Sequence, residues 1–75
     1  MTYGEKAVGL TFNPSNDPDV DEVKKLYAQI IDICFERRES APRTSADFGR
    51  LYSIAITQAQ QAQMWAVKAI TWKDE

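Results

Sequence analysis

Histidine is absent from the 75-residue chain, and Cys34 is its only cysteine. A nucleophile of the Ser-His or Cys-His type therefore cannot be assembled, and neither can a disulfide framework or a zinc site. Four of the eleven carboxylates cluster in residues 17–22, where they would cap a helix, and no metal-ligand spacing or phosphate-binding loop occurs. We therefore expect a binding protein without a cofactor or a metal, and not an enzyme.

Long apolar runs and long basic runs are both missing. No apolar stretch approaches the roughly 18 residues needed to cross a bilayer, and no signal peptide is recognisable, so we expect a cytoplasmic location and no membrane partner. With nine basic and eleven acidic residues the net charge is −2, which disfavours a protein that coats a polynucleotide. This balance still permits a small anionic ligand held in a local pocket.

Proline and glycine are scarce, at three each, and they help to mark the boundaries of two predicted helices. Asp17 followed by Pro18 is a strong helix start, because aspartate caps free amides and proline fits the first turn. The first helix is predicted over 17–39, with Arg37 and Arg38 in the last turn, where cations are favoured. Its apolar stripe consists of Val20, Val23, Leu26, Tyr27, Ile30, Ile31, Ile33 and Cys34.

The second helix is predicted over 46–72, after a turn at 40–45 with a cap at Thr44 or Ser45. One tyrosine and a series of alanines recur along it at steps of three and four, and we call them the alanine seam: Tyr52, Ala55, Ala59, Ala62, Ala66 and Ala69. A second stripe carries Leu51, Ile54, Gln58, Gln61, Trp65 and Trp72, and a third carries Ile56, Gln60, Gln63, Val67 and Ile70. One partner helix covers only one or two of these faces, so we infer that other chains cover the rest.

These patterns predict an all-α fold, a single domain over residues 1–75. It is a two-helix antiparallel hairpin with an extended N-terminal arm and loop at 1–16. A chain of this length is near the size at which one hydrophobic core becomes marginal, and oligomerisation often supplies the missing burial. We therefore expect the hairpins to assemble into a helical homo-oligomer.

Candidate binding residues lie first on the arm and the first helix. Phe12, beside Asn13, offers a flat face on which a nucleobase can stack, although packing of the arm over the helices would use the same ring. Lys24 and Lys25 are adjacent and diverge by about 100° around the helix, so only one of them can face a given pocket. A second interpretation of Lys25 is a solvated lysine whose stem covers apolar surface.

The second helix adds a polar belt in the middle of an otherwise apolar sequence, formed by Thr57, Gln58, Gln60 and Gln61. Buried amides need hydrogen-bond partners. These side chains either fix the register of a subunit interface or read the edges of a bound base. Trp65 and Trp72 are better suited to anchor an interface than to stack a ligand.

Residues 51–70 resemble the signature helix of the anti-CBASS cyclic-oligonucleotide sponges, a family of small phage proteins. The residues that carry the resemblance are Ile54, Ala55, Thr57, Gln60, Gln61, Met64, Lys68 and Ala69. The first helix matches less specifically, through Phe12 in the preceding loop and Lys25. The resemblance extends over residues 10–72.

The resemblance implies a homo-oligomer, typically a hexamer of interlocked hairpins, that acts in the cytoplasm of the bacterial host. Such proteins bind cyclic dinucleotide immune signals without cleaving them, and some also hold cyclic trinucleotides at separate sites. The ligand-binding residues expected here are Phe12, Asn13, Lys24, Lys25, Thr57, Gln60 and Gln61. The chain departs from the family where many members have Arg and His, since it has Ile56 and Gln58, and this affects the trinucleotide site.

The alternative is a structural or adaptor protein of a phage. In that case the same hairpin oligomerises and docks to a protein partner through its exposed tryptophans. Binding of a cyclic nucleotide to the purified protein separates the two hypotheses.

Overall fold

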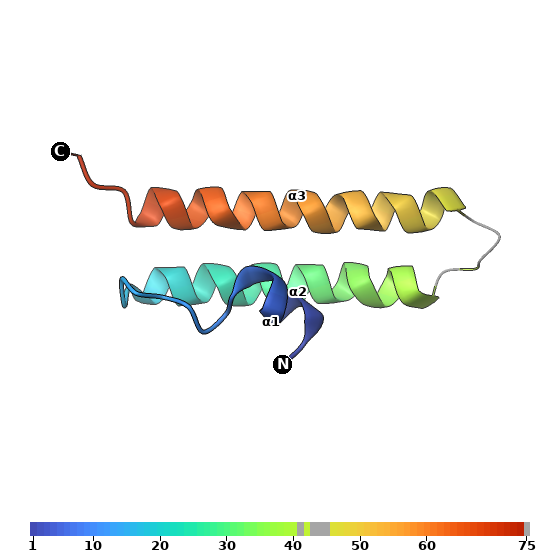
Figure 1. The fold of residues 1–75 in the computed structure, drawn as a ribbon, viewed down its shortest axis with the longest axis horizontal. Coiled ribbons are helices and arrows are strands. Elements are labelled where there is room, and N and C mark those ends of the chain that lie inside the picture. Colours follow the sequence, from blue (N-terminus) through green and yellow to red (C-terminus); the bar gives the residue numbers. More distant parts are fainter. Residues whose placement is uncertain (41, 43–45, 75) are drawn as a thin grey trace.

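The computed structural model describes residues 1–40, 42 and 46–74. Its helices are α1 (Tyr3–Val8), α2 (Pro18–Ser40) and α3 (Ala46–Ile70). Figure 1 shows α2 and α3 side by side, with α3 running back along α2 in the opposite direction and α1 lying against α2. The all-helical class predicted from the sequence is confirmed for the described residues.

Asp17 caps the N-terminus of α2. The Asp19 amide donates to Oδ1 of Asp17 at 2.9 Å, and the Val20 amide donates to the carbonyl oxygen of Asp17 at 3.1 Å. Pro18 occupies the first helical position, where its missing N–H leaves no hydrogen bond unmade. The helix start is thus built from the two residues that mark it in the sequence.

The other ends of the long helices differ slightly from the expected positions. α2 ends at Ser40, one residue beyond 39, and α3 ends at Ile70, two residues before 72. The predicted cap at Thr44 or Ser45 lies outside the described residues. Near this end of the hairpin, Arg38 of α2 donates to Oγ of Ser53 of α3 at 3.1 Å, which ties the two helices together.

The expectation of an extended arm over 1–16 is wrong for Tyr3–Val8, which form α1. Thr2 and Glu5 make a capping box: the Glu5 amide donates to Thr2 Oγ1 at 3.1 Å, and the Thr2 amide donates to Glu5 Oε1 at 2.8 Å. Gly9 ends the helix with a left-handed φ of 64°. A helix of six residues is too short to display an apolar stripe, so periodicity does not reveal it.

The hydrophobic core lies where the three helices meet. Its buried members are Val8 of α1, Ala28 and Ile31 of α2, and Ile56 of α3. Beside this core the ring of Tyr3 stacks on Phe35, with centroids 4.4 Å apart and planes inclined by 11°. α1 is therefore packed into the core, although it has only six residues.

α3 packs against α2 through its third stripe and part of its alanine seam. Ile56 and Gln63 of the third stripe are the buried residues of α3. In the alanine seam, Ala59 is half-buried and packs against the core, whereas Ala55, Ala62 and Ala69 are exposed. These exposed alanines stay available to another chain.

Large apolar side chains also remain exposed on both long helices. On α2 they are Leu26, Ile30 and Ile33, which are between 48% and 60% exposed. On α3 and just beyond its end they include Leu51, Ile54, Met64, Trp65 and Trp72, which are between 40% and 69% exposed. Among the described residues, no helix is both long and apolar enough to cross a membrane. The apolar surface is instead distributed in stripes, as in a helix that packs against other helices.

Candidate functional site

A hollow of about 220 Å³ lies where the loop after α1 meets the start of α2 and the end of α3. We call it the Phe12 hollow, and it is lined by Phe12, Asn13, Pro14, Ser15, Val20, Lys24, Val67 and Thr71. Because α3 runs opposite to α2, the last turns of α3 lie beside the first turns of α2 (Figure 1). The hollow thus joins three of the predicted site residues, Phe12, Asn13 and Lys24.

Asn13 organises the loop that carries Phe12. Its Nδ2 donates to the carbonyl oxygen of Asp17 at 2.9 Å and to Oδ1 of Asp21 at 3.0 Å. Its Oδ1 accepts a hydrogen bond of 2.6 Å from Oγ of Ser15. These bonds hold the loop onto the N-terminus of α2 and use most of the hydrogen-bonding capacity of the amide.

Phe12 and Lys24 differ sharply in exposure. The ring of Phe12 is 71% exposed, as a platform for stacking must be, whereas Lys24 is only 5% exposed. The Lys24 ammonium donates to the carbonyl oxygen of Gly9 at 3.0 Å and also to that of Phe12. It lies 5.5 Å from the centroid of the Phe12 ring, within the range of a cation–π interaction. A direct contact between Lys24 and a ligand stays a prediction.

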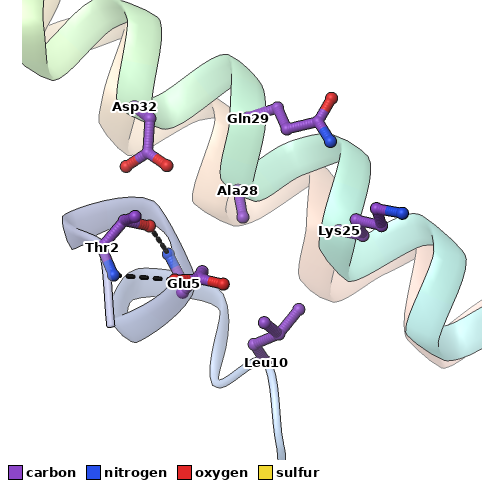
Figure 2. Close-up of a pocket in the computed structure, with 7 residues that line it drawn as sticks. All are labelled: Thr2, Glu5, Leu10, Lys25, Ala28, Gln29 and Asp32. Atoms are coloured by element: carbon purple, nitrogen blue, oxygen red, sulfur yellow. Dashed lines mark hydrogen bonds between the residues drawn. The ribbon is translucent and has the colours of Figure 1, made fainter.

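Lys25 lies on a different side of α2, as adjacent helical residues must. It is exposed and borders a smaller hollow of about 160 Å³ between α2 and the α1 region (Figure 2). The other lining residues are Thr2, Glu5, Leu10, Ala28, Gln29 and Asp32. The two carboxylates there already accept backbone hydrogen bonds, from Thr2 to Glu5 and from Gly4 to Asp32. Lys25 is the lining residue that carries a cation.

The polar belt of α3 faces several directions. Thr57 is exposed and donates through Oγ1 to the carbonyl oxygen of Ser53 at 3.1 Å, whereas Gln60 is half-buried. Gln61 is exposed and borders a shallow hollow with Met64, Trp65 and Lys68. The belt residues precede Val67 of the Phe12 hollow by six to ten residues, or about 9–15 Å along a helix axis, and none of them lines that hollow. A single chain therefore does not gather the belt and Phe12 into one pocket.

A family model that describes the Acb2/Tad1 hairpin domain matches residues 5–71. The chain belongs to this family, the anti-CBASS sponges. The match begins inside α1 and extends through α2 and α3. A search of curated proteins and a search of solved structures each found no match.

Some features of the site of this Acb2/Tad1 hairpin could not be found from the sequence. Val67 and Thr71 join the Phe12 hollow only through the pairing of α2 with α3. By contrast, the burial of Lys24 does have a signal in the sequence, because Lys24 lies four residues after Val20 and seven before Ile31 and so shares their side of the helix. The turn residues Pro14 and Ser15 did indicate a loop at this position.

Proposed function

We propose that this Acb2/Tad1 hairpin protein sequesters cyclic dinucleotide signals of bacterial antiphage immunity and does not cleave them. It acts as a homo-oligomer, with a hexamer as the form that the family resemblance implies, in the cytoplasm of the infected bacterium. Bound signal no longer reaches its effector, so CBASS defence is blocked. The observation that carries this proposal is the family match over residues 5–71, which takes in the whole hairpin and its Phe12 loop.

The chemistry of the ligand fits the side chains that the fold exposes. A cyclic dinucleotide presents two flat bases and two phosphates. The exposed ring of Phe12 can stack on a base, and stacking of this kind contributes about 1–3 kcal/mol per base. The exposed ammonium of Lys25 can neutralise a phosphate without the protein as a whole being basic.

The hydrogen-bond donors for the base edges come from Thr57, Gln60 and Gln61 of a second subunit. The belt lies about 9–15 Å along α3 from Val67 of the Phe12 hollow, and none of its residues lines that hollow, which supports this arrangement. It makes assembly a precondition for binding. The exposed alanines of the seam and the exposed Leu26, Ile30 and Ile33 supply the apolar surface for that assembly.

Cyclic trinucleotides are a second ligand class that some sponges hold. Here Ile56 occupies the position where many members have Arg, and its side chain is buried in the core of the hairpin. A buried isoleucine supplies neither a charge nor a hydrogen bond to a phosphate. We therefore propose cyclic dinucleotides as the main ligands and expect weaker binding of trinucleotides.

The decisive experiment is a thermal-shift and calorimetric screen of the purified protein against cyclic dinucleotides and trinucleotides. A ligand present at 100 times its dissociation constant should stabilise the folded oligomer by about 2.7 kcal/mol. Heat denaturation of the complex should then release the cyclic dinucleotide intact, as judged by chromatography. Linear products would contradict the sponge mechanism, and the absence of any shift would favour the adaptor hypothesis.

A further inference from the structure

Lys24 is a lysine placed where an apolar residue is usual. It belongs to the buried face of α2, together with Val20, Ala28 and Ile31. Burial of an ammonium group costs free energy unless hydrogen bonds replace the lost water. Here they do, because the ammonium donates to the carbonyl oxygens of Gly9 and Phe12. The stem of Lys24 fills the space between α2 and the loop, and its charged end binds that loop.

The two carbonyl oxygens bracket one turn of the chain. The Phe12 amide donates to the carbonyl oxygen of Gly9 at 2.9 Å, so the turn from Gly9 to Phe12 is closed by its own hydrogen bond. Lys24, which lies on α2, donates hydrogen bonds to both ends of this turn. Gly9, with its left-handed φ of 64°, allows the chain to leave α1 and enter the turn.

Few packing contacts fix the position of the Phe12 ring. Since 71% of the residue is exposed, packing restricts the ring only weakly, and its position depends on the main chain to which it is attached. The Lys24 ammonium, 5.5 Å from the ring centroid, adds an attraction to one face of the ring. The opposite face is left to a ligand.

We propose that Lys24 is a positioning residue that holds the Phe12 turn in the geometry required for base stacking. This inference rests on the proposed function. It states that Lys24 affects the affinity for the ligand by positioning Phe12, and not by contacting the ligand. If the Phe12 ring is already ordered before the ligand arrives, binding does not incur the entropic cost of ordering it. Loss of that preorganisation should weaken binding about three- to tenfold.

The first test needs no ligand. Hydrogen exchange of the Phe12 amide is measured in the unliganded oligomer of the parent protein, of Lys24→Met and of Lys6→Met. The Lys6 variant removes the same charge from an exposed side chain of α1. Faster exchange in Lys24→Met alone supports the proposal, and equal exchange in all three proteins overturns it. Because no ligand is used, this measurement tests the role of Lys24 even if the protein does not bind cyclic dinucleotides.

The second test is a double-mutant cycle on cyclic dinucleotide affinity, with Lys24→Met and Phe12→Ala singly and together. If Lys24 acts through Phe12, its replacement weakens binding in the parent protein but has little effect once the ring is gone. The same loss in both backgrounds would overturn the proposal in favour of direct contact with the ligand. If Lys24→Met does not fold, the cycle is repeated with Lys24→Arg, which keeps the charge but changes the geometry of the two hydrogen bonds.

Discussion

The backbone amide of Gly4 donates a hydrogen bond of 2.7 Å to Oδ1 of Asp32, and this bond joins the first turn of α1 to the middle of α2. Figure 2 shows α1 lying over the stretch of α2 that carries Ala28 and Asp32. The approach is so close that a Cβ at Gly4 would clash with the carbonyl oxygen of Ala28. Gly4 is therefore required by space and not by an unusual backbone conformation.

Gly4→Ala should destabilise the protein by about 1–3 kcal/mol, because α1 must move away from α2 to admit the methyl group. The matched control is Gly49→Ala in α3, where the added Cβ meets nothing within 4 Å. That variant should stabilise the protein by about 0.5–1 kcal/mol through helix propensity. Denaturant unfolding of both variants checks the pair. Equal effects would show that α1 does not dock closely in solution.

Phe12→Ala and Lys25→Ala should each weaken cyclic dinucleotide binding at least tenfold, or by about 1.4 kcal/mol. Neither residue lies on the alanine seam, so the oligomer should stay intact. Phe12→Tyr, which keeps the ring, and Lys6→Ala, which removes an exposed charge elsewhere, are the controls and should retain affinity. Calorimetry measures the affinity, and light scattering measures the mass. Wild-type affinity in both alanine variants would make this site assignment wrong.

A discrete oligomer is expected in solution, because the packing of α3 on α2 leaves Ala55, Ala62 and Ala69 of the alanine seam exposed. Ile33→Asp should lower the mass measured by light scattering, since Ile33 is 60% exposed in the chain and a charge there is costly only when a partner buries it. Ser40→Asp adds the same charge at the end of α2 and should leave the mass unchanged. A stable monomer of 8.5 kDa at micromolar concentration would contradict assembly.

Ala62→Leu tests the alanine seam itself. Ala62 is exposed within one chain, so any effect of the larger side chain must arise from contact with another chain. We expect overpacking of a close helix approach to cost about 1–3 kcal/mol and to lower the melting temperature in a concentration-dependent manner. Ala46→Leu, at an exposed position outside the seam, is the control. An unchanged melting temperature and mass would place Ala62 in solvent.

The fold class and the start of α2 follow from local chemistry. Asp17 and Pro18 act through groups within one turn of themselves, and the apolar periodicity of two long segments extends over six or more turns. Such signals can be recognised in the sequence without a tertiary structure. The residues that carry the family resemblance lie on one such helix, and the family match confirms that reading.

Only the tertiary structure decided three other features. Periodicity counts the apolar faces of α3 but does not say which one meets α2, since that choice depends on the side chains of both helices at once. It is the stripe with Ile56 and Gln63, joined by Ala59 of the alanine seam. The sequence carries caps for the short helix α1 at Thr2, Glu5 and Gly9, but the docking of α1 on α2 depends on contacts with residues far along the chain. Lys24 shares the side of α2 that carries Val20, but the hydrogen bonds that bury its ammonium group come from the docking of the loop onto α2, while Lys25 stays in solvent.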